Sequence, residues 1–173
     1  FANNIVLIAD TLSTIEKYIQ MSNNAYGQDP NPFVITRAIS LFERSLISGQ
    51  STYDAEINYG YEAAMSNSAK LGMDLFFGKL QCGNCHSGFN FTNYAFENNG
   101  LYEVYADEGR ARFTQKDEDV ALFKVPTLRN VELTSPYMHD GSLFTLEEVI
   151  AHYNSGGADH PNKSAILKSL NLT

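Results

Sequence analysis

Two cysteines and a histidine lie close enough together in the sequence to act on one metal ion or cofactor. Cys82 and Cys85 are the only cysteines in the chain, and His86 follows the second one directly. Three chemistries use such a spacing: a structural zinc site, a redox-active dithiol, and covalent attachment of a c-type haem. In the third, both thiols form thioether bonds to the haem vinyl groups, and His86 supplies the proximal bond to iron.

The rest of the chain favours the haem. A zinc site needs a second ligand pair, but no further cysteine exists, and His139, His152 and His160 do not form a compact pair. A redox-active dithiol should follow a strand and open a helix, whereas a helical pattern precedes this motif. Covalent haem attachment takes place outside the cytoplasmic membrane. The motif therefore also predicts a periplasmic or otherwise extracytoplasmic protein.

The ligand at the iron position opposite His86 would decide what such a haem does. Methionine raises the reduction potential, histidine lowers it, tyrosinate stabilises ferric iron, and an empty position admits peroxide. Spacing alone does not choose a ligand; the candidates are Met65, Met73, Met138, His139, His152, Tyr153 and His160. The aromatic residues Phe89, Phe91, Tyr94 and Phe96 could line the flat macrocycle, or could equally be ordinary core residues.

The sequence around the motif predicts a mainly α-helical fold with long loops. Amphipathic patterns predict helices over residues 5–26, 32–47 and 66–77, the last of which ends close to the motif. The segment Ser48–Ser51 looks like a domain boundary. Residues 87–122 show little regular pattern, and a loop of that length inside a compact domain is usually functional.

A fourth helix is marked by its own end signals. Thr145 and Glu148 form a capping box at its start, and the pair Gly156-Gly157 ends it. One face of this helix is apolar and carries Tyr153, so the side chain of that tyrosine should point inward.

Composition argues against nucleic acid and anionic membranes as partners. The net charge of -8 and the pI near 4.9 disfavour nucleic acid and anionic membranes, whose phosphates require clustered basic residues. No apolar run reaches the length of about 18 residues that a membrane-spanning helix needs. The composition is otherwise that of an ordinary globular protein.

Two long motifs resemble a known family. The stretches "LFFGKLQCGNCHSGFNFTN" and "FKVPTLRNVELTSPYMHDGSLFTLEEVIAHYNSGG" look like the C-terminal haem domain of the bacterial di-haem cytochrome c peroxidase and MauG family. The stretch "ITRAISLFERSLISGQSTYD" is similar to the segment that joins the two haem domains of that family. The resemblance covers about residues 25–173. It implies a cytochrome c-like helical haem domain at 50–173, with residues 1–49 as the end of the preceding, peroxidatic domain and a linker.

The resemblance also implies roles for individual residues. Cys82, Cys85 and His86 match the haem that accepts or stores electrons, and Tyr153 matches the distal ligand of that haem in MauG-type enzymes, with Met138 as the fallback. Independently of the resemblance, Arg129 and Lys124 could pair with haem propionates, because arginine forms bidentate bonds to carboxylates, although either could equally form a surface ion pair. Thr134 and Pro136 match positions whose backbone carbonyls bind a calcium ion.

The expected function follows from the same resemblance. The chain would be the electron-transfer half of a periplasmic di-haem peroxidase that reduces hydrogen peroxide or uses it, like MauG, to oxidise a partner protein. An electron-donor cytochrome or a cupredoxin would then be a partner, and a homodimer is expected. Because the chain holds no second Cys-x-x-Cys-His motif, we expect the catalytic haem in a part of a longer protein not included here. The alternatives are a mono-haem electron carrier and a haem-bearing subunit of a larger assembly.

Overall fold

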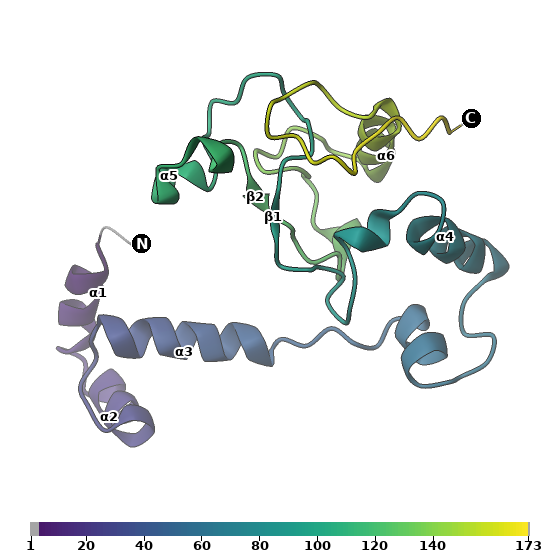
Figure 1. The fold of residues 1–173 in the computed structure, drawn as a ribbon. Helices are drawn as coiled ribbons and strands as arrows, with labels where there is room; N and C mark the ends of the chain where they lie inside the picture. Colours follow the sequence, from purple (N-terminus) through teal and green to yellow (C-terminus); the bar gives the residue numbers. More distant parts are fainter. Residues whose placement is uncertain (1–3, 173) are drawn as a thin grey trace. The chain divides into compact units, whose positions relative to one another are not determined.

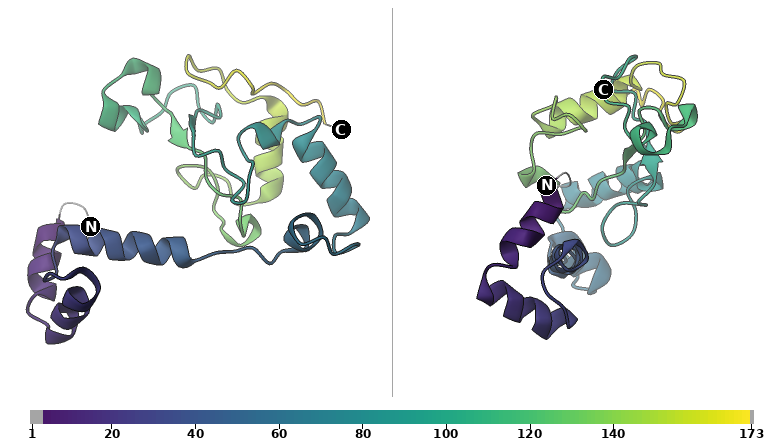
Figure 2. Two further views of the ribbon diagram at one scale, coloured as in Figure 1. Left: turned by 60° about the horizontal axis from the view of Figure 1, so that its bottom comes forward. Right: turned by 90° about the vertical axis from the view of Figure 1, so that its left-hand side faces the viewer.

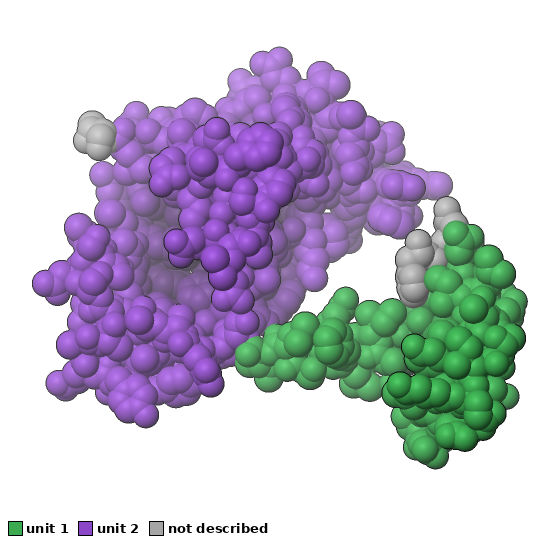
Figure 3. All heavy atoms as spheres, turned by 180° about the vertical axis from the view of Figure 1, so that it is seen from behind, with its two compact units in different colours: residues 1–47 green, residues 48–173 purple. Residues whose placement is uncertain are grey.

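The chain folds into two compact units. The computed structural model describes residues 4–172, and its contacts divide the chain into residues 1–47 and residues 48–173 (Figures 1 and 3). We refer to these as unit 1 and unit 2 and describe each by itself. The division lies beside the segment Ser48–Ser51, but the assignment of each unit to a haem domain stays a prediction.

Unit 1 consists of three helices, α1 (Ile5–Leu12), α2 (Glu16–Tyr26) and α3 (Pro32–Ser45). The prediction of one continuous helix over residues 5–26 is wrong, because the chain leaves the helical conformation at Ser13–Ile15. The hydroxyl of Thr14 donates to the carbonyl of Thr11 at 2.8 Å, and that of Ser13 donates to the carbonyl of Pro30 at 3.1 Å. Serine and threonine side chains that bond to the backbone in this way compete with the helix.

Helix α3 begins as its sequence predicts. The side chain of Asn31 accepts a hydrogen bond from the amide of Val34 at 3.1 Å, and Pro32 occupies the first helical position. Both features stabilise a helix N-terminus. Val34 and Ile35 are buried within unit 1, whereas Phe42 on the same helix is 63% exposed.

Unit 2 is held together by short elements and by the loops between them. Helix α4 (Asn67–Phe77) starts at Ser66, whose hydroxyl accepts from the amide of Ala69. Helix α6 (Leu146–Ser155) starts at the predicted capping box of Thr145 and Glu148 and ends at Gly156, as expected. The remaining elements are a π-helical turn η2 (Asp54–Asn58), the 3-10 turns η3 (Cys82–Asn84), η4 (Asp117–Asp119) and η5 (Val131–Leu133), the helix α5 (Ala111–Thr114), and the strands β1 (Phe96–Glu97) and β2 (Phe123–Lys124).

The protein is therefore mainly helical with long loops, as the sequence predicted. Strands β1 and β2 pair in the antiparallel direction, with Phe96 opposite Lys124 and Glu97 opposite Phe123. The segment after α6 folds back beside that helix, where the amide of Leu170 donates to the carbonyl of Asn154 at 3.2 Å (Figure 2). Within residues 4–172, no helix combines the length and the apolar character required to cross a bilayer.

Polar groups occupy much of the interior of unit 2. Asp54 and Asn98 are the largest side chains that are fully buried. Their apolar neighbours in the core are mostly small, and the buried apolar residues of unit 2 are Met65, Ala111, Ala121 and Val125. Buried polar groups require hydrogen-bond partners, and the partners of these two residues turn out to fix the loops around the candidate site.

Candidate functional site

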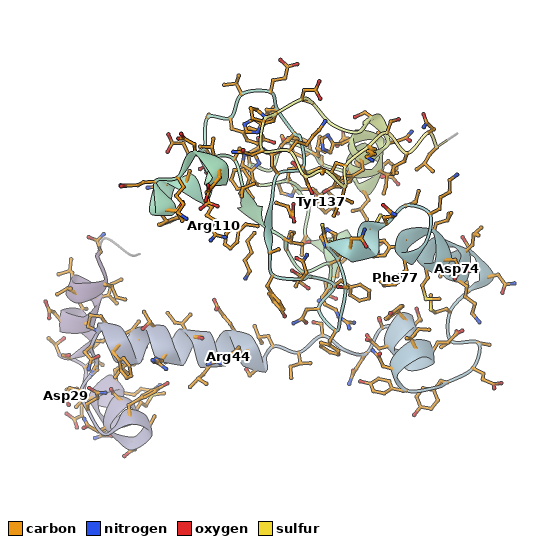
Figure 4. All side chains as sticks on the ribbon, viewed as in Figure 1. Asp29, Arg44, Asp74, Phe77, Arg110 and Tyr137 are labelled. Carbon is orange, nitrogen blue, oxygen red and sulfur yellow. The ribbon has the colours of Figure 1, made fainter. Side chains whose placement is uncertain are left out.

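The Cys-x-x-Cys-His motif forms a single helical turn. Backbone amides of Cys85 and His86 both donate to the carbonyl of Cys82, at 3.2 and 2.9 Å. A β-carbon added at Gly83 would lie 2.5 Å from a ring carbon of Phe77, so only glycine allows α4 to approach the turn this closely. Figure 4 labels Phe77 at the end of α4, next to the turn. Helix α4 thus positions the motif.

The imidazole of His86 is held in one orientation. Its Nδ1 atom lies 3.0 Å from the carbonyl oxygen of Phe91. A carbonyl oxygen can only accept a hydrogen bond, so Nδ1 carries the proton and the lone pair of Nε2 is free. Burial lowers the pKa of His86, which favours the neutral ring, while the carbonyls of Phe91 and Pro126 oppose that effect. Metal-bound histidines almost always donate their second ring N–H to such an acceptor.

The loop that carries Phe91 is itself fastened at several points. The amide of Asn93 donates to the carbonyl of Cys85 at 2.8 Å, which closes the loop back onto the motif. The hydroxyl of Thr92, a buried residue, donates to the carbonyl of Val125 at 2.6 Å. These bonds join the motif to the strand β2 region and keep the Phe91 carbonyl beside His86.

The two thiols are not activated. Cys82 and Cys85 are both half-buried and form no disulfide. Burial raises the pKa of each thiol, and the nearby Glu97 carboxylate raises that of Cys85 further. A redox-active dithiol requires a lowered thiol pKa, so this arrangement does not support one. Within the described residues, no group of three or more histidine, cysteine or acidic side chains is arranged to hold a metal ion.

The donor set fits a covalently attached haem. Two half-buried thiols stand within one turn, and the adjacent neutral imidazole presents a free Nε2 whose other nitrogen is already bonded to the backbone. Cys82, Cys85 and His86 would hold the group, the cysteines through thioether bonds and His86 through iron.

Among the candidates for the opposite iron position, Tyr153 is placed with the motif. Its phenol is half-buried, and burial is the main cause that raises the pKa of Tyr153. A hydrogen bond with the side chain of Asn99 lowers this pKa, and the cysteines at positions 82 and 85 are near enough to raise it electrostatically. The half-buried position of Tyr153 agrees with its place on the apolar face of α6, and its role as an iron ligand stays a prediction.

The remaining candidates have other partners. The sulfur of Met138 accepts a hydrogen bond from Asn99, and Nε2 of His152 donates to the backbone carbonyl of the same residue at 2.9 Å. The ring of His139 stacks on Phe123, with the ring centroids 3.9 Å apart. Met65 is buried in the core of unit 2, and Met73 lies on α4.

His160, another of the iron-ligand candidates, is hydrogen-bonded within unit 2. Its Nδ1 atom lies 3.2 Å from Nδ2 of the buried Asn98 and 3.1 Å from the amide of Asn162. Because both of these neighbours are donors, Nδ1 accepts and the proton lies on Nε2. The sequence could not indicate this role, since Asn98 is 62 residues away along the chain.

Arg129 has protein partners for three of its nitrogens. Its Nη2 lies 2.8 Å from Oδ1 of Asp54, Nη1 bonds to Oδ2 of the same carboxylate, and Nε donates to the carbonyl of Phe89 at 2.7 Å. The carbon at the centre of the guanidinium lies 4.4 Å from the Phe89 ring centroid and 5.0 Å from that of Phe91. Arg129 therefore forms a buried ion pair and not the surface pair that the sequence analysis offered as the alternative, and contact with a haem propionate stays a prediction.

The four aromatic residues suggested to line the macrocycle differ in their surroundings. Phe91 packs against Tyr53, with ring centroids 5.1 Å apart. The other three are more exposed and each lies beneath a cation: Phe89 beneath Arg129, Tyr94 beneath Lys124, and Phe96 beneath Arg110, which is labelled in Figure 4. Their role beside a haem stays a prediction.

Comparisons with known proteins agree with this geometry. No family model matches the chain. The MauG protein of Methylorubrum extorquens is 34% identical over 171 residues, a match that covers 96% of this chain and 48% of that protein. The cytochrome-c peroxidase IdrP1 of Denitromonas iodatirespirans is 33% identical over 194 residues, covering 94% of this chain and 52% of that protein. The chain belongs to the MauG and bacterial cytochrome c peroxidase family.

Solved structures of a MauG-like protein and of a di-haem peroxidase share the fold. A MauG-like protein associated with microbial copper homeostasis superposes with a TM-score of 0.80 at 30% identity, covering 99% of this chain and 58% of that one. The di-haem peroxidase BthA of Burkholderia thailandensis has a TM-score of 0.68 at 20% identity and supports the fold alone. The chain spans about half the length of the curated relatives that it matches.

Proposed function

We propose that this chain is the electron-transfer half of a di-haem peroxidase, with a c-type haem attached at Cys82 and Cys85 and bound through iron by His86. The observation that carries this proposal is the protonated Nδ1 of His86 on the Phe91 carbonyl, which leaves Nε2 as a ligand. The family membership supports the reaction class, since the relatives are named MauG and cytochrome c peroxidase. The chain would thus be part of an oxidoreductase.

The bound haem would supply reversible one-electron chemistry. The chain's own contribution is to tether, orient and shield this group. Thioether bonds from Cys82 and Cys85 would fix its position, and the Phe91 carbonyl holds the imidazole plane and raises the basicity of Nε2. The Asp54–Arg129 ion pair supports this arrangement, because Arg129 bonds the Phe89 carbonyl and lies against the Phe91 ring.

We assign Tyr153 to the opposite side of the haem. Its support is the half-buried position on α6 within electrostatic reach of both cysteines, and the similarity to MauG. The test is Tyr153→Phe in the haem-loaded protein, followed by ferric optical and electron paramagnetic resonance spectra. Loss of the wild-type ligand signature is expected, and an unchanged spectrum would remove Tyr153 from the site.

Residues 1–49 are proposed to end the preceding, peroxidatic domain, and residues 50–173 to form the electron-transfer domain. Supporting this, unit 1 exposes large apolar side chains such as Leu7 and Phe42, at 65% and 63%. A surface of this kind suits an element that packs within a larger domain. The test is the intact mass of the full-length gene product, which should contain two covalent haems. A single haem on a complete chain of this length would instead favour a mono-haem electron carrier.

The proposed reaction uses hydrogen peroxide in the periplasm. An electron-donor cytochrome, a cupredoxin or a protein substrate would exchange electrons with the haem of this chain, and a homodimer is the proposed assembly. Rapid mixing of the reduced full-length protein with peroxide tests the reaction, since oxidation of the haem bands should accompany peroxide loss. Absence of that oxidation would contradict it.

Calcium is proposed at the backbone carbonyls of Thr134 and Pro136. Among the described residues, neither oxygen accepts a protein hydrogen bond, so both are able to bind a cation that prefers oxygen ligands. Metal analysis of the full-length protein before and after chelation tests this assignment. Absence of calcium from the untreated protein would reject it.

A further inference from the structure

Unit 2 has a groove beside α5 that the proposed function does not use. The groove has a volume of about 580 Å³ and is lined by ten residues from β1, β2 and the segment around α5. We call it the α5 groove. None of these ten residues belongs to the Cys-x-x-Cys-His motif or to α6, so the groove is separate from the proposed haem site. Its volume falls in the range of sites that bind small molecules.

The walls of the α5 groove are largely aromatic and apolar. The apolar side chains in the lining are those of Phe96, Phe113, Leu122 and Phe123. Phe113 is 84% exposed and Phe96 is 38% exposed, so both rings are accessible to a molecule that arrives from solvent. Flat apolar faces of this kind suit a ligand with an aromatic body.

Basic side chains stand among these rings. Arg110, Arg112 and Lys124 line the α5 groove, whereas Asp107 is the single carboxylate among the described residues of the lining. Nε of Arg110 lies 3.3 Å from Oδ2 of Asp119, but in the described part of the chain neither Arg112 nor Lys124 forms a salt bridge. In a protein with a net charge of -8, this local excess of positive charge favours an anionic ligand.

The backbone around the α5 groove is fixed by hydrogen bonds within the protein. The amide of Arg110 donates to the carbonyl of Leu122 at 2.9 Å, and the amide of Ala121 donates to the carbonyl of Glu108 at 3.0 Å. The guanidinium of Arg110, which Figure 4 labels beside α5, lies 4.6 Å from the centroid of the Phe96 ring. A site that is already formed costs less conformational entropy on binding.

We propose that the α5 groove binds a small aromatic carboxylate. The aromatic body would lie against Phe96 and Phe113, and the carboxylate would face Arg112 and Lys124. A guanidinium can pair with a carboxylate through two parallel hydrogen bonds. A small molecule is favoured over a protein partner because only ten residues line the groove, whereas a stable protein interface takes about 20–30 residues on each side.

Equilibrium dialysis of the full-length, haem-loaded protein against naphthoate tests this inference. Saturable binding with a Kd of about 1 mM is expected for an aromatic carboxylate of this size. Naphthamide, which has a similar shape but no charge, should bind about tenfold more weakly. In Arg112→Gln/Lys124→Gln, the Kd for naphthoate should also rise about tenfold. Because neither residue has a salt bridge to lose within the described chain, the variant should keep the wild-type circular dichroism spectrum.

The matched control is Arg37→Gln/Lys168→Gln, which removes the same charge outside the α5 groove. Arg37 also lies over an aromatic ring, at 4.7 Å from the centroid of Phe33, so the control removes a cation of the same kind. Its Kd for naphthoate should equal that of the wild type. Phe113→Ser removes an exposed wall of the groove and should weaken binding about threefold.

Four results would each overturn the inference. These are the absence of saturable naphthoate binding, equal affinity for naphthoate and naphthamide, equal weakening in the two double variants, and a change in the haem absorption bands when naphthoate is added. Sedimentation tests a different occupant, since loss of a dimer in Phe113→Ser with unchanged naphthoate binding would assign the groove to a second copy of the chain. The dialysis result does not depend on the reaction with peroxide, so this inference and the proposed function can fail separately.

Discussion

Replacing Asp54 by asparagine is expected to destabilise the folded protein by about 3–5 kcal/mol, the usual cost of breaking a buried ion pair from one side. The Asp54 side chain is 0% exposed and that of Arg129 is 10% exposed, so the guanidinium would lose its counter-charge away from water. The carboxylate also accepts from Ser51 and from Nδ2 of Asn58. In either orientation, the asparagine side chain of the variant would therefore place its own NH2 group against one of these hydrogen-bond donors.

Urea unfolding followed by circular dichroism measures this loss. The matched control is Glu118→Gln, which removes the same charge from an exposed pair. Glu118 and Lys116 are 3.4 Å apart, with side chains 77% and 62% exposed, and such pairs contribute at most about 1 kcal/mol. The reasoning is refuted if Asp54→Asn loses no more stability than this control.

The pH dependence provides a second check. The hydrogen bond from Arg129 is the largest cause that holds the pKa of Asp54 well below its usual value, and burial opposes it. A carboxyl whose folded-state pKa is lowered contributes fully above its unfolded pKa of about 4, and that contribution is lost as the pH falls below it. Between about pH 4 and pH 2, stability should therefore decline more steeply in the wild type than in Asp54→Asn. Equal slopes would contradict this assignment.

Two further predictions concern the ends of α6. Thr145→Ala removes the hydroxyl that accepts from the amide of Glu148, so it should lower the free energy of unfolding by about 1 kcal/mol, as measured with urea. Amide hydrogen exchange in the first turn of α6 should also become faster. Unchanged exchange there would contradict the prediction. Gly156→Ala places a β-carbon 2.7 Å from the amide nitrogen of Ser169 at a φ of +86°, so it should lower stability by more than about 1 kcal/mol. Gly72→Ala, in the exposed part of α4 with nothing within 4 Å, should instead stabilise by up to about 1 kcal/mol, and an equal loss in both variants would refute the steric explanation.

Features that depend on a few consecutive residues could be predicted from the sequence. The capping box at Thr145 and Glu148, the glycine at the end of α6 and the Cys-x-x-Cys-His turn all involve neighbours within four residues. The half-buried position of Tyr153 followed from the same helix, because an apolar helix face indicates which side chains point inward, whereas its role as an iron ligand came from the family resemblance and stays a prediction.

Features that depend on partners far away along the chain could not be predicted from the sequence. Asp54 is paired with Arg129 across 75 residues of sequence, and an isolated aspartate near a boundary gives no sign of burial. The break between α1 and α2 was missed for a related reason. The apolar pattern continues through Ser13–Ile15, while the hydroxyl that interrupts the helix bonds to Pro30. Asn99 lies in a segment without periodicity, so its contacts with Met138 emerged only from the structure.

The group that orients His86 is a main-chain carbonyl, not a side chain. Phe91 has a left-handed backbone, with φ of +50°, and its carbonyl oxygen exists whatever residue stands at that position. Point substitutions at position 91 can therefore change the packing and the strain of the loop but cannot delete the acceptor. The hydrogen-bond acceptor of His86 Nδ1 therefore persists through point substitutions at position 91, and only changes that move the loop can remove it.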